Sequence, residues 1–441
     1  MICALLSGTF AACGRTPASK PDTALRDKVL SKLEGYSRDA HADMIKNFWS
    51  EEKGYMVDPY KDGHGRDTFS DIMWVYVQGL LCFESYIAAT GDESAKRYIQ
   101  TQTDVWLNSF TRSYLTATGT GNNPAHDDAA WTAMGFILGY KFTGNETCLD
   151  YCRRMIKRSY DYWEDGSTAN GLWYKYDQDG SSTVKSVYCA GLILSELEYY
   201  ALTKGTENED AELHQRTMEL YNWVEENLCR DGVKVWNGVT SDVVDYLYYC
   251  DFYEDIEAGL RYPVGYDRPN DINPAGSVSS LFGNTAMAVI HKRLYDLTGD
   301  ESYLEKAVRT ANALTGTAYN ADGIIKNDRD AWTNSAFMGY FVREVLPLEG
   351  ISPELGRMFI NTAASIMKNA FFEGGFYGAD WGGGDRWLRN EALGDPSYLT
   401  TSATTVHILH AACYAVKNGL AEPTEGDAEL FNFEPSPKPL G

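Results

Sequence analysis

Residues 287–307 read MAVIHKRLYDLTGDESYLEKA, and this stretch decides the fold. Met287, Ile290 and Leu294 recur at the spacing of one helix face, and a second helical pattern begins after the phrase TGDES. Gly299 supplies the left-handed residue that commonly ends a helix, and the acidic residues after it favour the positive end of the next helix. The stretch therefore predicts two helices joined by a tight turn.

The same phrase recurs along the chain, as TGDES at Thr90, TGNET at Thr143, TKGTENED at Thr203 and TGDES at Thr298. The intervals are 53, 60 and 95 residues, the last wide enough for two copies, and such periods signal stacked structural units. The apolar stripes predict twelve helices, at 24–49, 68–90, 92–112, 127–142, 145–163, 184–203, 209–228, 277–298, 300–315, 332–347, 352–371 and 398–417. Six helical hairpins without a long alternating strand pattern favour an all-α (α/α)6 barrel, a toroid whose inner helices are the more apolar ones.

Composition excludes some function classes. The 441 residues include 62 Asp and Glu against 39 Lys and Arg, a formal net charge of −23, which opposes the basic footprint of a nucleic-acid binder. Aromatic residues make up 13% of the chain, and flat amphipathic rings of this kind stack on the apolar faces of sugars. No apolar run is long enough to span a membrane.

The N-terminus MICALLSGTFAAC, residues 1–13, resembles the end of a bacterial lipoprotein signal, with Cys13 as the lipidated residue. We therefore expect a signal segment at 1–13, a tether at 14–23, one catalytic domain at 24–420 and a C-terminal tail at 421–441. The protein would be secreted across the inner membrane and anchored by lipid on the periplasmic or cell-surface face of a bacterial outer membrane. A monomer is the default oligomeric state.

Two inserts, 229–276 and 372–397, are rich in Gly, Pro, Asp and aromatic residues, and each precedes an expected inner helix. Loops of this kind collect at one face of a rigid scaffold and build its site. Asp127 and Asp128 begin the helix that continues into Trp131, and adjacent aspartates there either cap the helix or form a catalytic pair. Retaining glycosidases need two carboxyl groups about 5 to 5.5 Å apart, and two neighbouring like charges push their pKa values apart.

At this pair the sequence resembles glycoside hydrolase family 76, the endo-acting α-1,6-mannanases, from about residue 30 to 417. The resemblance is carried by HDDAAWTAMGFILGYKFTGN, NGLWYKYDQDGSSTVKSVYCAGLILSELEYY, WNGV, LFGNTAMAVIHKRLYDLTGDESYLEKA and WTNSAFMGYFVREV. It implies an (α/α)6 barrel in which Asp127 is the nucleophile and Asp128 the general acid and base of a double-displacement reaction on α-mannan.

Further residues are candidates for substrate binding because they lie beside these segments or in the Gly-rich insert: Trp74, Trp131, Trp173, Tyr188, Asn284, Trp332, Trp381 and Trp387. Each aromatic among them has core packing as the competing interpretation. No metal ligand set is evident, because His407 and His410 lack a third ligand, and no cofactor is expected.

Two other classes stay open. One is another α/α-toroid sugar enzyme, an unsaturated glucuronyl hydrolase or a sugar epimerase, although the net charge and the Asp pair argue against both. The other is a lipid-anchored glycan-binding protein on the same toroid, although binding alone does not require two carboxylates at one bond.

Overall fold

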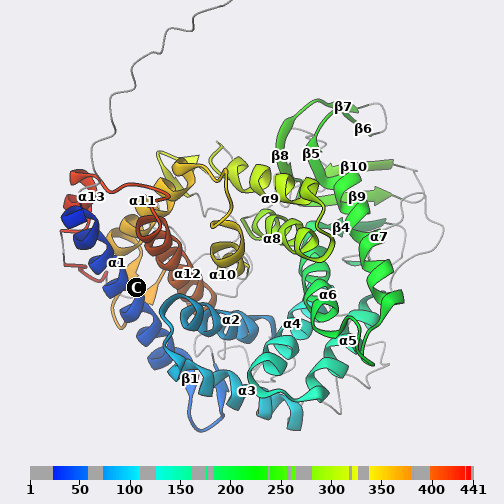
Figure 1. The fold of residues 1–441 in the computed structure, drawn as a ribbon, viewed down its shortest axis with the longest axis horizontal. Helices are drawn as coiled ribbons and strands as arrows, with labels where there is room; N and C mark the ends of the chain where they lie inside the picture. The colour runs from blue at the N-terminus through cyan, green and yellow to red at the C-terminus, as the bar shows by residue number, and fades with distance from the viewer. Residues whose placement is uncertain are drawn as a thin grey trace, which may run out of the picture.

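A computed structural model describes residues 23–57, 73–109, 126–160, 175–176, 182–236, 239–255, 260–264, 281–316, 320–325, 337–378, 381, 398–432 and 434–438. Six helical segments form a closed inner ring in which each contacts the next (Figure 1). In order around the ring, they are α2 (Met73–Thr90), α4 (His126–Thr143), α6 (Ala190–Thr203), α8 (Leu281–Thr298), α10 (Met338–Tyr340) with its π-helical continuation η4 (Phe341–Val345), and α12 (Tyr398–Lys417).

An outer layer of helices covers this ring and alternates with it along the chain. The outer helices are α1 (Thr23–Phe48), α3 (Lys96–Ser109), α5 (Glu146–Tyr160), α7 (Ala211–Leu228), α9 (Glu301–Ala313) and α11 (Pro353–Asn369). The two layers differ in the way that the sequence requires: α8 is buried without interruption from Leu281 to His291, whereas α5 buries one stripe that includes Cys148, Cys152 and Ile156. The expected all-α (α/α)6 barrel is confirmed.

The repeated TGDES-like phrases form the joints between inner and outer helices. At Thr298 the hydroxyl donates to the Leu294 carbonyl and accepts the backbone N–H of Asp300, whose carboxylate in turn accepts the N–H of Ser302. Gly299 lies between them in the left-handed region at φ 72°. The joints at Thr90 and Thr143 repeat this pattern of hydrogen bonds. The expected capping role is therefore confirmed at these three joints.

Short strands lie in the segments between the helices of the barrel, and the helix pattern in the sequence does not predict them. A four-stranded antiparallel sheet has the order β10 (Leu260–Val264), β9 (Asp251–Asp255), β4 (Ser182–Ser186) and β3 (Lys175–Tyr176). Two-stranded pairs are formed by β1 (Trp49–Ser50) with β2 (Tyr55–Met56), β5 (Cys229–Asp231) with β8 (Val244–Tyr248), β6 (Lys234–Trp236) with β7 (Val239–Ser241), β11 (Asn320–Ala321) with β12 (Ile324–Ile325), and β13 (Phe371–Phe372) with β14 (Phe376–Tyr377). The helix expected at 184–203 consequently starts only at Ala190, after β4 and the turn η3 (Val187–Cys189).

The C-terminal segment expected as a tail contains the helix α13 (Glu425–Leu430), which packs on α1 and α11. Thr424 and Asp427 form a capping box at its start, and Phe431 is buried at its end. The signal segment 1–13 and most of the tether 14–23 lie outside the described residues. Among the residues that the structure covers, no helix is long and apolar enough to cross a membrane.

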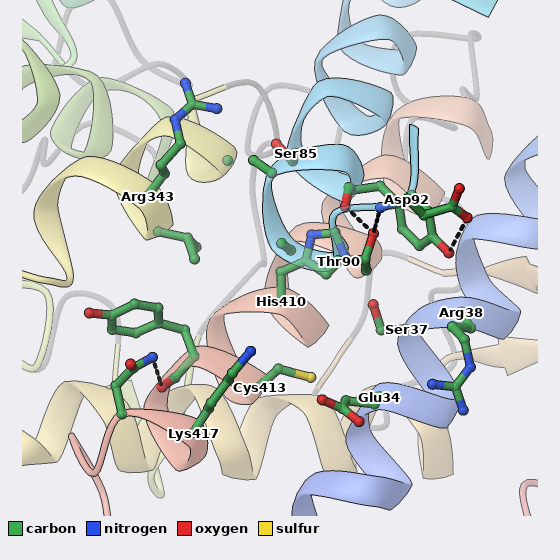
Figure 2. Close-up of a pocket in the computed structure, with 17 residues that line it drawn as sticks. Glu34, Ser37, Arg38, Ser85, Thr90, Asp92, Arg343, His410, Cys413 and Lys417 are labelled. Atoms are coloured by element: carbon green, nitrogen blue, oxygen red, sulfur yellow. Dashed lines mark hydrogen bonds between the residues drawn. The ribbon is translucent and has the colours of Figure 1, made fainter. Parts of the chain in front are cut away.

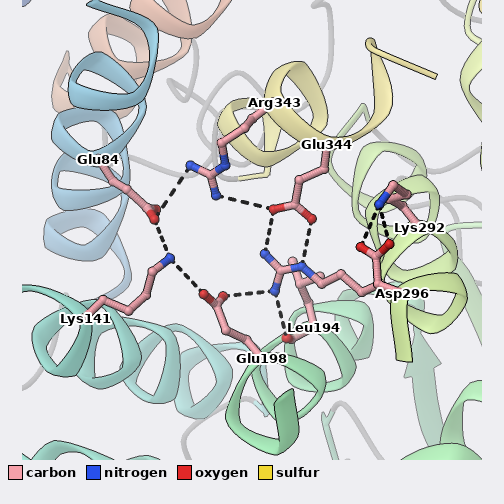
Figure 3. A network of polar contacts seen from close by, with 9 residues as sticks. Glu84, Lys141, Leu194, Glu198, Lys292, Asp296, Arg343 and Glu344 are labelled. Atoms are coloured by element: carbon pink, nitrogen blue, oxygen red, sulfur yellow. Dashed lines mark hydrogen bonds and ion pairs between the residues drawn. The ribbon is translucent and has the colours of Figure 1, made fainter. Parts of the chain in front are cut away.

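Six charged side chains close a ring of ion pairs inside the barrel (Figure 3). Around the ring they are Glu84, Lys141, Glu198, Arg293, Glu344 and Arg343, and they come from α2, α4, α6, α8 and η4. Three cations face three anions, so the ring is neutral as a whole. Buried charges are tolerated when they are paired in this way.

Candidate active site

Asp127 and Asp128 lie in the first turn of α4, an inner helix. The side chains of residues 126–128 are outside the described residues, so the distance between the two carboxyl groups stays a prediction. Consecutive Cα atoms are about 3.8 Å apart, and neighbouring positions on a helix differ by about 100° in direction. The backbone therefore places both residues side by side at the N-terminal end of inner helix α4.

An aromatic cluster lies one turn below the aspartates. Trp131 of α4 stacks on Phe337 with the ring centroids 5.2 Å apart and the planes inclined by 6°, and it meets Phe282 of α8 at 5.6 Å. Phe282 and Phe337 touch each other at 4.9 Å. All three side chains are at least 96% buried. The cluster connects three inner segments beneath the start of α4, so it fixes the position of that turn.

Asn284 is fully buried, and its side-chain oxygen accepts the backbone N–H of Tyr248 at 2.9 Å. This bond fastens β8, part of the first insert, to the inner helix α8. The Tyr248 hydroxyl donates to the Glu225 carboxylate, which also pairs with His291 and Lys306.

Burial alone would raise the pKa of the Glu225 carboxyl, but the hydrogen bond from His291 and the charge of Lys306 lower that pKa to about 2. The insert is thus held by a carboxylate that stays ionised.

Trp381 is 1% exposed, and its backbone carbonyl accepts the Ser365 hydroxyl of α11. It anchors the end of the described part of the second insert to the outer layer. Trp74 in α2 and Tyr188 in η3 have described backbones, but their side chains are outside the described residues. Trp173, Trp332 and Trp387 lie outside those residues altogether. The predicted substrate contacts at all of these positions stay predictions.

No group of three or more His, Cys, Asp or Glu side chains could hold a metal ion within the described ranges. His407 and His410 are buried in α12, and burial lowers the pKa of each imidazole to about 3, so both rings are neutral. The seven cysteines in the described parts of the chain are free thiols, all of them buried except Cys413, which is partly exposed.

Sequence reasoning did not single out Phe282, Phe337 or Tyr248. Phe282 and Phe337 are each within a segment that resembles family 76, and each lies at the start of an apolar inner helical segment, which was the available signal. Tyr248 carried no such signal, because its role depends on a pairing of β8 with α8 that no local pattern encodes.

The sequence has no match among protein-family models or curated proteins. Solved structures, in contrast, share its architecture over most of its length, and the fold they share with it is the α/α toroid. An α-1,6-mannanase of glycoside hydrolase family 76 from a Salegentibacter species has a TM-score of 0.62 at 15% identity, with 86% of this chain and 98% of that one covered. A second structure of that enzyme is an inactive variant, in which two consecutive aspartates are replaced by asparagines, bound to α-1,6-mannotriose.

Two further structures extend the comparison. A family 76 mannosidase from Bacteroides thetaiotaomicron has a TM-score of 0.61 at 16% identity, covering 88% of this chain and 99% of that one. An unsaturated glucuronyl hydrolase from Streptococcus agalactiae has a TM-score of 0.54 at 13% identity, covering 89% and 93%. The chain therefore has the fold of the family 76 glycoside hydrolases, and the predicted resemblance is confirmed at the level of the fold.

Proposed function

We propose that this protein is an endo-acting glycoside hydrolase. It cleaves internal bonds of α-1,6-linked mannan and retains the anomeric configuration. The observation that carries the proposal is the Asp127–Asp128 pair in the first turn of inner helix α4. It is supported by the shared fold and by the Salegentibacter enzyme, whose inactive variant replaces two consecutive aspartates.

The position of the pair suits a double displacement. Asp127, ionised, attacks the anomeric carbon, while Asp128, protonated, gives its proton to the departing glycosidic oxygen. Asp128 then removes a proton from water, which attacks the glycosyl-enzyme bond and releases Asp127. The positive end of the α4 dipole favours one ionised carboxylate in this turn, and repulsion between adjacent carboxylates favours protonation of the other.

Hydrolysis of unbranched α-1,6-mannan by the purified protein tests the proposal, with product size and anomeric configuration followed by NMR. We expect short oligosaccharides that are α-configured when first released. Asp127→Asn and Asp128→Asn should each reduce turnover by at least about a hundredfold. Asp104→Asn, at an exposed position in α3, is the matched control and should retain full activity.

Other outcomes lead elsewhere. Binding of mannan without cleavage would replace the proposal by a glycan-binding protein. Activity on unsaturated uronyl oligosaccharides, but not on mannan, would favour the glucuronyl hydrolase, the class to which the Streptococcus agalactiae structure belongs. First products of β configuration would refute the retaining mechanism, but the assignment of α-1,6-mannan as the substrate would stand.

Three of the candidate binding residues have described side chains, and all three are buried. Because Trp131, Asn284 and Trp381 are at least 96% buried, we propose that they position the site, so that replacing them lowers turnover and stability together. Trp74, Trp173, Tyr188 and Trp332 are proposed to contact the sugar, and their replacement by Ala should raise KM without loss of stability.

We also propose that Cys13 anchors the protein to the membrane by lipid. Incorporation of labelled palmitate into the wild type, but not into Cys13→Ser, would support this. Equal labelling of the two proteins would refute it.

A further inference from the structure

A pocket of about 620 Å³ opens at the end of the barrel opposite to the Asp pair. It lies between α1, α2, η4 and α12, and its lining includes Ser85 of α2 and His410 of α12 (Figure 2). Ser85 is twelve residues after the start of α2, which corresponds to about 18 Å of helix from the end where Asp127 lies. The proposed catalytic residues therefore contribute nothing to this pocket.

Buried polar atoms without partners line the pocket. His410 is 5% exposed, and neither of its ring nitrogens has a hydrogen-bond partner among the described residues. Ser37 of α1 is 3% exposed, and its hydroxyl oxygen likewise has none there. Proteins seldom leave such groups unsatisfied, because water is lost without compensation. These atoms are covered in the structure, but both side chains line the pocket, so a rotation of each would let a ligand there supply the missing hydrogen bonds.

The chemistry of the lining selects among ligands. The neutral His410 ring offers one donor and one acceptor, the Ser37 hydroxyl offers both, Lys417 donates and Glu34 accepts. Figure 2 shows Lys417 pointing towards His410, and Glu34 on the other side of Cys413, below Ser37. A ligand with several hydroxyl groups can pair with all of these donors and acceptors, because each hydroxyl group both donates and accepts a hydrogen bond. Tyr414, half-buried in the same lining, offers an aromatic face to an apolar C–H surface.

An anionic ligand is not favoured. Arg38, Arg343 and Lys417 line the pocket together with Glu34 and Asp92, but Arg343 is already paired with Glu84 and Glu344. The remaining two cations and two anions balance, and the chain as a whole carries a net charge of −23. A volume of about 620 Å³ is within the range of small-molecule sites. We propose that this pocket is a second binding site, separate from the candidate active site, for a neutral sugar of one or two residues. The proposal rests on the pocket alone and is independent of the proposed hydrolase activity.

Cys413 gives a local readout, because it lines the pocket and is the partly exposed cysteine among those described. Burial raises the pKa of its thiol to about 12, so its slow alkylation by iodoacetamide at pH 9 reports access to the pocket. The rate is read by peptide mass spectrometry on the full chain, with and without methyl α-mannoside, α-1,6-mannobiose or mannose 6-phosphate. We expect the two neutral sugars to slow alkylation at least about fivefold at saturation.

Three variants test whether the protection arises in the pocket. His410→Phe removes both ring nitrogens while retaining a ring, and Lys417→Met removes the ammonium. Each should raise the sugar concentration for half protection about tenfold. Lys28→Met, at an exposed position on α1, is the matched control and should leave it unchanged. Far-UV circular dichroism confirms that each variant is folded.

If neither neutral sugar slowed alkylation of Cys413, the proposal would be overturned. It would also be overturned if His410→Phe and Lys417→Met were half protected at the same sugar concentration as the wild type. Stronger protection by mannose 6-phosphate than by the neutral sugars would overturn the neutral class. If the Asp127→Asn, Asp128→Asn double variant lost protection, the effect would come from the other end of the barrel and the second site would be refuted. Protection together with failure to cleave mannan would support the pocket and refute only the hydrolase.

Discussion

Replacing Arg293 by Met tests whether the ion-pair ring holds the inner helices together. The guanidinium donates two hydrogen bonds of 3.0 Å to Glu344, one of 2.9 Å to Glu198 and one of 3.5 Å to the Leu194 carbonyl (Figure 3). It therefore joins α8 to α6 and to η4. Methionine fills part of the same volume, but it leaves the largely buried carboxylates of Glu198 and Glu344 without the cation that they share. Removing one partner of a buried pair costs about 3 to 5 kcal/mol.

The pKa of Glu198 gives a second route to the magnitude. Burial raises the pKa of this carboxyl, but Arg293 and then Lys141 outweigh burial and lower it to about 2, against 4.5 in the unfolded chain. A depressed carboxyl pKa stabilises the fold fully above pH 4.5, and this contribution is lost as the pH falls from 4.5 towards 2. The difference corresponds to about 3 kcal/mol at neutral pH. This figure combines the effects of burial, Arg293 and Lys141 on Glu198, so it agrees with the first figure in order of magnitude.

Urea unfolding at pH 7, followed by far-UV circular dichroism, measures the change. Arg293→Met should lower the free energy of unfolding by about 3 to 5 kcal/mol, and the variant should lose part of the parent's dependence on pH below 4.5. Lys292→Met is the matched control, because the neighbouring Lys292 pairs with Asp296 at 2.6 Å at the surface. That pair contributes at most about 0.5 kcal/mol. An Arg293→Met variant as stable as Lys292→Met would refute the reasoning.

Three further perturbations have outcomes that follow from single contacts. A Cβ at Gly339 would lie 1.9 Å from the Ser85 hydroxyl oxygen, so Gly339→Ala should cost about 1 to 3 kcal/mol, part of it recovered in the double variant with Ser85→Ala, as measured by urea unfolding. Asn284→Ala leaves the Tyr248 N–H without its acceptor and should cost about 1 to 3 kcal/mol, with faster amide exchange at Tyr248 as the site-specific readout. Burial lowers the pKa of His407 to about 3, so the native state resists its protonation and stability is lost as the pH falls from 6.5 towards 3. His407→Gln should therefore reduce the change of the urea unfolding midpoint between pH 7 and pH 5. A variant that kept the parent's slope there would contradict this assignment.

The fold could be predicted from sequence because its signals are local. The joints at Thr90, Thr143 and Thr298 each combine a Thr hydroxyl, a left-handed Gly and a capping carboxylate or amide within five residues. The expected helix at 398–417 is α12 to the residue. The strands were missed because they are two to five residues long, and a pairing such as β4 with β9 joins Ser182 to Asp255 across the whole of α6 and α7. No local pattern carries that information.

The site was only partly predictable for the same reason. The placement of Asp127 and Asp128 in the first turn of an inner helix followed from the stripe that begins at Trp131, and the described backbone agrees with it. The partners of Trp131 could not be inferred, since Phe282 and Phe337 reach it from helices more than 150 residues away in sequence. Asn284, predicted beside the substrate, is bonded to the Tyr248 backbone, and predicting that contact would have required knowledge of where the insert folds back.

The ion-pair ring and the aspartate pair occupy opposite ends of the same helices, and this separation decides what can tune the pair. Lys141, the ring member on α4, follows Asp127 by 14 residues, or about 21 Å of helix. A single charge at that distance contributes about 0.8 kcal/mol at an effective dielectric constant of 20, and the ring as a whole is neutral, so its net field at the pair is smaller still. The ring therefore contributes little to the difference in pKa that a retaining mechanism requires, whereas the repulsion between the two carboxyl groups and the positive end of α4 both favour that difference. Arg293→Met should accordingly lower stability while leaving the pH optimum of the proposed hydrolysis unchanged, whereas Asp128→Asn should abolish that optimum.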